Sequence, residues 1–252
     1  MSKFKFKDKS FCICGENLDF KNTIVIDHSW GEIKYTRCNS CLTWNQSPEI
    51  SIDSILSWYN SDDYQKSGKE GGYLNYESEE IQRNTESLFR YNRLIKYNKI
   101  KMGSVLEIGC ASGSFLKVLR KNGWSVTGID ISERFCRLAK KNNIRVICED
   151  FNKWNFTERF DLIVILGSIS NLQSVKKSIR KAYQLLNEGG CLYINYPDST
   201  SITSKVYGNN HWMFTPSVNT FFSSNGIRIF LEKEGFVNVK IHRDWKKHHF
   251  QN

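Results

Sequence analysis

Apolar positions after residue 102 alternate between short continuous runs and stretches with helical spacing. Short apolar runs are typical of parallel strands that are covered on both faces, and the spaced stretches are typical of helices that pack on such a sheet. The alternation therefore predicts a doubly wound α/β fold, with a mostly parallel sheet and helices on both faces. The predicted strands span residues 104–108, 125–129, 145–148, 161–166, 191–196 and 236–241.

The end of the predicted sheet leaves several possibilities open. Eleven residues follow position 241, and residues 245–250 could add an antiparallel strand beside 236–241. Otherwise the chain is shortened, or the sheet ends in an exposed edge that would favour association. The oligomeric state therefore stays open.

Residues 49–102 have the pattern of a helical connector. Ile52, Ile55 and Tyr59 share one helical face, and a second helix is predicted over residues 79–97. Between them, residues 64–76 form a loop rich in tyrosine and glycine that could close over a bound ligand, although tyrosines are also common in surface loops. Three segments result: residues 1–48, the connector with its possible lid at 49–102, and a main domain at 103–252.

The first segment contains two close cysteine pairs, Cys12 with Cys14 and Cys38 with Cys41. Four thiolates around one zinc ion can stabilise a segment that is too small to bury a core of its own. The spacing predicts a zinc-ribbon-like segment with structural zinc, because a closed four-cysteine site leaves no position for a substrate. The C-x-C pair is one residue tighter than usual, so a site with His28 or with three cysteines is an alternative.

Composition and charge narrow the class of protein. A chain of 252 residues with 40% hydrophobic residues can form one full core and a small additional unit. It has no run of about eighteen apolar residues and no apolar signal core behind its N-terminus, so we expect a soluble, cytoplasmic protein without a membrane partner. The net charge of +10 suits an anionic partner, although dispersed lysines more often form a solvated surface.

Candidate chemistry concentrates where the first strand of the main domain turns into a helix. Gly109 and Gly113 flank this turn, and Glu107 precedes it. Glycines let the backbone approach a ligand closely at the carboxyl edge of a Rossmann-like sheet. Asp130 ends the next strand, where a carboxylate can accept hydrogen bonds from both hydroxyls of a ribose. The two features predict a cofactor that contains adenosine.

The details of the turn distinguish between two such cofactors. A nicotinamide dinucleotide requires G-x-G-x-x-G, so that its diphosphate rests on the helix N-terminus. Here Ala111 replaces the middle glycine, and the carboxylate of Glu107 would repel a phosphate. That carboxylate suits the amino group and the sulfonium of S-adenosylmethionine. The turn therefore favours S-adenosylmethionine.

With these motifs the sequence resembles the class I methyltransferase family, and within it a bacterial group that carries an N-terminal zinc-ribbon segment and often modifies sugars. The resemblance implies that Gly109 to Gly113 wrap the methionine portion and that Asp130 binds the ribose. Asp150 and Phe151 would border the adenine, although they could instead be a loop carboxylate and a core aromatic. The complete predicted cofactor set is Glu107, Gly109, Cys110, Ala111, Gly113, Asp130, Ile131, Asp150, Phe151, Leu166, Gly167 and Ser168.

Catalytic residues are harder to assign, because two histidines that are common in the family are absent. Ser170 and Asn171 stand where relatives often carry Glu-His, and Asn219 stands where they often carry a histidine. His211 remains as a candidate base, although a buried, hydrogen-bonded histidine is the ordinary alternative. Further candidates for orienting a substrate are Asn171, Tyr73 and Tyr76.

Three functions compete at this point. The leading hypothesis is a methyltransferase that acts on a small molecule. The family resemblance implies a sugar as its acceptor, and a basic surface favours a nucleotide-linked sugar in polysaccharide biosynthesis, because such a sugar carries a diphosphate. The second is an RNA-directed methyltransferase that uses the ribbon to bind nucleic acid. The third is a noncatalytic protein that binds S-adenosylmethionine, which the missing histidines would explain.

Overall fold

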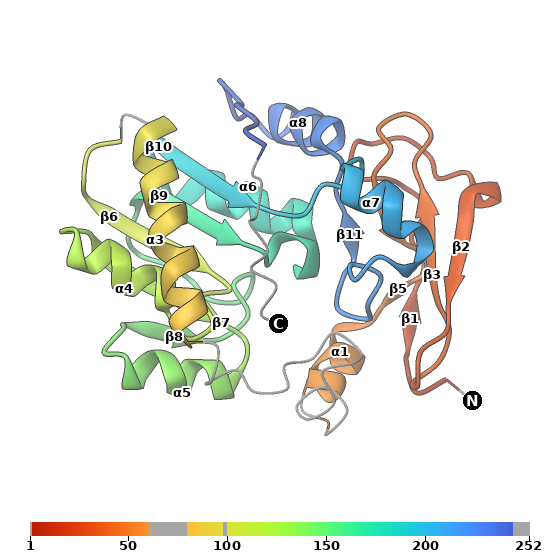
Figure 1. Cartoon of the computed structure of the whole chain (residues 1–252), viewed down its shortest axis with the longest axis horizontal. Helices are drawn as coiled ribbons and strands as arrows, with labels where there is room; N and C mark the ends of the chain where they lie inside the picture. The colour runs from red at the N-terminus through yellow and green to blue at the C-terminus, as the bar shows by residue number, and fades with distance from the viewer. Residues whose placement is uncertain (1, 60, 62–79, 98–99, 244–252) are drawn as a thin grey trace.

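A five-stranded and a four-stranded β-sheet, with a further two-stranded one, organise the described part of the chain (Figure 1). The computed structural model describes residues 2–59, 61, 80–97 and 100–243. The possible lid at residues 64–76, with Tyr73 and Tyr76, and the candidate strand at 245–250 lie outside these residues. No helix in the described ranges is long and apolar enough to cross a membrane.

The larger sheet has five strands in the order β10-β9-β6-β7-β8, and every neighbouring pair is parallel. From β6 the chain proceeds to β7 and β8 on one side, and it then returns to β9 and β10 on the other. The carboxyl ends of β6 and β9 therefore flank the switch point, where doubly wound sheets bind ligands. The strands are β6 (Ser104–Ile108), β7 (Ser125–Asp130), β8 (Val146–Cys148), β9 (Phe160–Leu166) and β10 (Leu186–Asn195).

Helices cover both faces of this sheet, as the apolar pattern predicts (Figure 1). Side chains alternate along β9, where Ile163 and Ile165 join one buried cluster and Leu162 and Val164 join the other. The first cluster includes side chains of α6 and α8, and the second includes side chains of α3, α4 and α5. The helices are α3 (Glu80–Tyr97), α4 (Ser114–Lys121), α5 (Glu133–Lys141), α6 (Val175–Leu185) and α8 (Ser224–Lys233).

The predicted strand at residues 236–241 is wrong. The chain has no strand there, although Phe236, Val239 and Ile241 still pack against the core. Asn238 has φ +56°, a left-handed conformation that interrupts an extended strand. The apolar alternation in this segment therefore reflects burial of side chains and not pairing in the sheet.

The smaller sheet is antiparallel, with the order β11-β4-β3-β2. Its edge strand β11 comes from residue 220, far along the chain from the other three. A separate two-stranded sheet pairs β1 with β5. The elements of this region are β1 (Phe6–Lys7), η1 (Phe20–Asn22), β2 (Thr23–Ile26), β3 (Ile33–Arg37), β4 (Trp44–Gln46), β5 (Glu49–Ile50) and β11 (Thr220–Phe221).

The N-terminal region shares a hydrophobic core with later parts of the chain, in line with the expectation that this segment is too small to bury a core of its own. Helix α1 (Ile52–Tyr59), which the sequence predicts correctly, contributes Ile55 and Trp58 to this core. Met213 and Phe214 reach it from the segment that follows α7 (Ile202–Tyr207) and η3 (Gly208–Asn210). The hydroxyl of Tyr35 lies 2.7 Å from the carbonyl oxygens of Thr215 and Val218. Chain from both ends of the sequence therefore builds this unit.

Candidate active site

The turn from β6 into α4 lies at the carboxyl edge of the larger sheet. Gly109 and Gly113 both have φ +72°, and Ala111 between them has φ +47°. A Cβ atom on Gly109 would lie 2.6 Å from the side chain of Ser168, so this position accepts only glycine. The side chain of Ser168 in turn donates a hydrogen bond to the carbonyl oxygen of Ile108 at 2.8 Å, which holds the segment after β9 against the end of β6.

Asp130 is fixed beside this turn at the end of β7. Its Oδ2 accepts a hydrogen bond from the backbone N–H of Ala111 at 2.9 Å, and its Oδ1 accepts one from the N–H of Ser132 at 2.8 Å. Burial raises the pKa of the Asp130 carboxyl, while these N–H groups lower it. Each carboxylate oxygen has a second lone pair that can accept a ligand hydroxyl. Ile131 follows directly in the connection to α5.

Glu107 lies beneath the turn with only 3% of its surface exposed. Its Oε2 has no hydrogen-bond partner among the described residues. Burial raises the pKa of this carboxyl to about 8, against a smaller lowering by Arg90. A buried carboxylate oxygen without a donor fits a ligand that brings N–H groups and positive charge. The methionine portion of S-adenosylmethionine has both, so the residues of the turn fit this cofactor.

The predicted residues after β8 and β9 occupy different environments. Oδ1 of Asp150 accepts from the N–H of Asn152 at 2.8 Å, which is the local turn of a loop carboxylate. Phe151 is 4% exposed and belongs to the core cluster that contains α6, which supports the alternative of a core aromatic. Leu166 and Gly167 end β9 next to Ser168. Direct contacts thus join the turn to Asp130 and Ser168, and Asp150 follows the neighbouring strand β8.

Sequence analysis missed a polar group from the N-terminal region. Tyr59, the last residue of α1, lies close enough to Asn171 and Ser217 for their side chains to lower the pKa of its hydroxyl. Burial raises the pKa of this phenol, and the nearby charge of Asp130 raises it further. Spacing assigned Tyr59 only to an apolar helical face, and no local signal shows that this face meets residue 171 across the fold.

Two buried polar atoms adjoin this group. Ser170 and Asn219 are both 0% exposed, and the N–H of Asn219 donates to the carbonyl oxygen of Ser170 at 2.7 Å. Within the described ranges, Oγ of Ser170 and Oδ1 of Asn219 have no hydrogen-bond partner. Asn171 belongs to the short helix η2 (Ile169–Asn171), and its N–H bonds the carbonyl oxygen of Ser168 at 3.0 Å. Neutral hydroxyl and amide groups are therefore concentrated near Ser168.

His211 lies in a different environment from the one expected of a catalytic base. Its ring stacks between Trp212 and Phe221, with centroid distances of 3.9 and 4.8 Å. Its Nδ1 accepts from the N–H of Met213 at 3.2 Å, and its Nε2 lies 3.3 Å from Oγ of Ser204. Burial lowers the pKa of His211 to about 4. Both nitrogens have protein partners, so the geometry favours the structural alternative.

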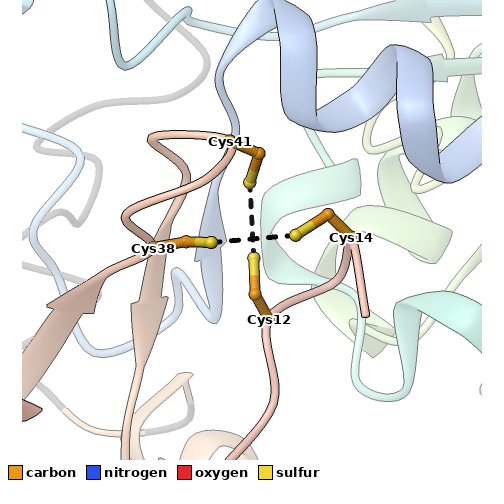
Figure 2. Close-up of side chains that lie close together, drawn as sticks. All are labelled: Cys12, Cys14, Cys38 and Cys41. Atoms are coloured by element: carbon orange, nitrogen blue, oxygen red, sulfur yellow. Dashed lines mark hydrogen bonds between the residues drawn. The ribbon is translucent and has the colours of Figure 1, made fainter. Parts of the chain in front are cut away.

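Four cysteine side chains converge from two loops of the N-terminal region (Figure 2). All four are buried, and their sulfur atoms lie within 4.8 Å of one another. The Sγ atoms of Cys12 and Cys41 are 3.5 Å apart, and those of Cys14 and Cys38 are 3.7 Å apart. These separations are too long for disulfides, and they approach the edge of about 3.8 Å of a tetrahedron with zinc–sulfur bonds of about 2.3 Å. The four residues therefore fit a zinc ion, and His28 lies outside this set.

The fold and the turn define a protein that binds S-adenosylmethionine on a doubly wound sheet, and sequence comparison identifies its family. Residues 73–241, which are more than half of the chain, match the family model described as a methyltransferase domain. The chain belongs to this family and is an S-adenosylmethionine-dependent methyltransferase.

Individual relatives match only part of the chain. The uncharacterized protein MJ1123 of Methanocaldococcus jannaschii is 31% identical over 144 residues, which are 56% of this chain and 68% of the relative. A ubiquinone biosynthesis O-methyltransferase of Coxiella burnetii is 29% identical over 103 residues, 38% of this chain. The match covers only 44% of that enzyme's length.

Solved structures agree on the fold. A possible histamine N-methyltransferase from Thermotoga maritima superposes with a TM-score of 0.53 at 23% identity, and the match covers 64% of this chain and 75% of that one. A methyltransferase from Archaeoglobus fulgidus gives 0.54 at 22% identity, with 64% and 73% covered. At these identities the likeness concerns the architecture alone.

The buried carboxyl of Glu107 predicts how stability depends on pH. Between its ordinary pKa of 4.5 and its folded pKa of about 8, the folded chain retains a proton that the unfolded chain has lost. Stability therefore falls as the pH rises through this window. Glu107→Gln cannot ionise, so urea unfolding should find it roughly 2–4 kcal/mol more stable than the wild type at pH 9, with little difference at pH 4.5.

Glu158 provides the control for this measurement, because its carboxylate forms an exposed ion pair with Arg145. Glu158→Gln should leave the pH dependence of unfolding unchanged. Equal slopes for Glu107→Gln and the wild type between pH 5 and 9 would contradict the assignment.

Proposed function

We propose that this methyltransferase transfers the methyl group of S-adenosylmethionine to a small-molecule acceptor, a nucleotide-linked sugar in polysaccharide biosynthesis. The observation that carries the proposal is the group of neutral polar side chains of Tyr59, Asn171 and Ser217, which lies near Asp130 and Ser168. Such neutral donors and acceptors suit a ligand that carries several hydroxyls. The net charge of +10 favours an acceptor that also bears a diphosphate.

Residues of the turn would hold the cofactor. Asp130 would bind the ribose hydroxyls, and Glu107 would face the positive charge of the methionine portion. Gly109, which has no side chain, would let the backbone approach the cofactor closely. When bound, the sulfonium supplies an electrophilic methyl group. Leu166, Gly167 and Ser168 would line the cofactor on the side of β9, and Asp150 would border its adenine.

The acceptor would be oriented by groups from the N-terminal region and from the larger sheet. Tyr59 comes from α1, while Asn171 follows β9 of the larger sheet. Because methyl transfer is an in-line displacement, its rate depends strongly on the alignment of acceptor and methyl. The raised pKa of Tyr59 keeps its hydroxyl protonated at neutral pH, so its role would be hydrogen bonding. Asn171 thus stays a proposed site residue, and Tyr59 takes the place of His211.

The four clustered cysteines would hold a structural zinc ion that joins the N-terminal region to α8. Oγ of Ser223, which caps α8, donates to the carbonyl oxygen of Cys41. Nζ of Lys233, at the other end of this helix, donates to the carbonyl oxygen of Cys14 at 2.6 Å. Free thiols throughout the described chain suit a reducing compartment, which supports a cytoplasmic location.

Asp130→Asn tests the cofactor site. The amide turns one acceptor into a donor and removes the negative charge, so calorimetry with S-adenosylhomocysteine should show at least a tenfold loss of affinity. Asp161→Asn is the matched control. The Asp161 carboxylate also accepts a hydrogen bond from a backbone N–H, that of Ser104 at 2.7 Å, but it lies at the amino ends of the strands, away from Asp130. Equal affinities for the two variants would contradict the role of Asp130.

Transfer from labelled S-adenosylmethionine to a panel of uridine-, thymidine- and guanosine-diphosphate sugars tests the acceptor class. We expect turnover with at least one of them. Tyr59→Phe removes only the hydroxyl, so it should raise the KM for that sugar at least fivefold while the affinity for S-adenosylhomocysteine stays unchanged. Tyr183→Phe, at a half-exposed ring, should match the wild type. Failure of the whole panel would reject nucleotide-linked sugars as acceptors.

Metal analysis tests the zinc site. Protein purified without added zinc should contain one equivalent, and Cys38→Ser should lower both this content and the melting temperature. Cys191→Ser, in β10 of the larger sheet, should keep the metal. A metal-free wild-type protein with an undiminished melting temperature would exclude structural zinc.

A further inference from the structure

Two cysteines outside the four-cysteine cluster, Cys136 and Cys148, meet at Asp130. Cys148 ends β8 and is the register partner of Asp130 in β7. Cys136 lies on α5, with its Sγ 3.4 Å from the carbonyl oxygen of Asp130. The two thiols are close enough for Cys148 to raise the pKa of the Cys136 thiol. A helix and an edge strand thus bring two thiols together at the residue proposed to bind the ribose.

The two thiols differ in their access to solvent. Cys136 is 2% exposed, whereas Cys148 is exposed. Burial raises the pKa of the Cys136 thiol above its usual range. A dissolved oxidant therefore meets Cys148 first, and Cys136 can react only with a partner that is already adjacent. An accessible cysteine next to a second one is the usual arrangement of a reactive and a resolving thiol.

We propose that Cys136 and Cys148 form a reversible disulfide, and that this bond weakens cofactor binding at Asp130. Disulfide formation depends only on the position of the two thiols. Its effect on binding rests on the proposed role of Asp130, so the two parts are tested separately.

The oxidant that fits this chemistry is a small disulfide, such as oxidised glutathione. The thiolate of Cys148 attacks one sulfur of the oxidant, which forms a mixed disulfide and releases one thiolate. The thiolate of Cys136 then attacks the sulfur of Cys148, which closes the protein disulfide and releases the second thiolate. The two leaving groups take up the two protons lost by the cysteines. Two protein thiols are oxidised, and one small disulfide is reduced to two thiols.

The new bond would act on Asp130 through its immediate contacts. It removes the S–H donor that Cys136 offers to the carbonyl oxygen of Asp130, an oxygen that also accepts from the N–H of Glu149 at 3.1 Å. It also ties α5 to β8, and the N-cap of α5 is Ser132, whose N–H holds Oδ1 of Asp130. Because linkage is reciprocal, bound cofactor disfavours the disulfide to the same degree.

The test treats the purified protein with oxidised glutathione, digests it without reductant and searches by mass spectrometry for peptides joined through Cys136 and Cys148. Calorimetry measures the affinity for S-adenosylhomocysteine three times: before oxidation, after oxidation, and after subsequent reduction. We expect the joined peptides and at least a fivefold loss of affinity that reduction reverses. Cys148→Ser should lose this sensitivity, whereas Cys191→Ser should retain it, because β10 and β8 are opposite edges of the sheet.

Three results would contradict different parts of this proposal. Glutathione that remains attached to Cys148, without joined peptides, would overturn the disulfide. Joined peptides with an unchanged affinity would overturn the coupling to Asp130. A reduced protein that binds no S-adenosylhomocysteine would overturn the role of Asp130 itself, and the joined peptides would still decide whether the disulfide forms.

Discussion

The hydrogen bonds between the Asp130 carboxylate and the backbone of two strand-to-helix connections are the constraint on which the site depends. One oxygen holds Ala111 in the left-handed conformation of the first turn, and the other holds Ser132 at the start of α5. A single side chain therefore fixes the ends of β6 and β7 relative to each other. The same carboxylate is the one proposed to accept ribose hydroxyls, so the proposed cofactor site and the local fold would share one group.

The buried carboxyl of Glu107, next to this turn, lowers the stability of the fold when it is ionised. Oε2 of Glu107 is buried without a hydrogen-bond partner among the described residues, and burial raises the pKa of this carboxyl because it disfavours a negative charge there. Such a group is expected where a ligand, and not the protein, supplies the missing hydrogen bonds. Positive charge on a bound cofactor would offset this cost, because it would restore a favourable environment for the carboxylate.

The N-terminal region is more than an attachment to the methyltransferase domain. Its sheet includes β11 from residue 220, its core includes Phe214, and its helix α1 places Tyr59 against Asn171. The clustered cysteines lie against α8 through the contacts of Ser223 and Lys233. The proposed zinc site, the N-terminal core and the acceptor side of the active site are therefore mechanically connected.

The sequence by itself determined the doubly wound sheet, five of its strands, the glycine turn with Asp130, and the cysteine pairs, because each depends on local spacing or on periodic burial of side chains. Only the tertiary structure decided that residues 236–241 are not a strand, that the ring of His211 stacks on two aromatic rings, and that Tyr59 lies near Asn171. These outcomes depend on tertiary contacts, and local sequence patterns do not indicate which segments pack against each other.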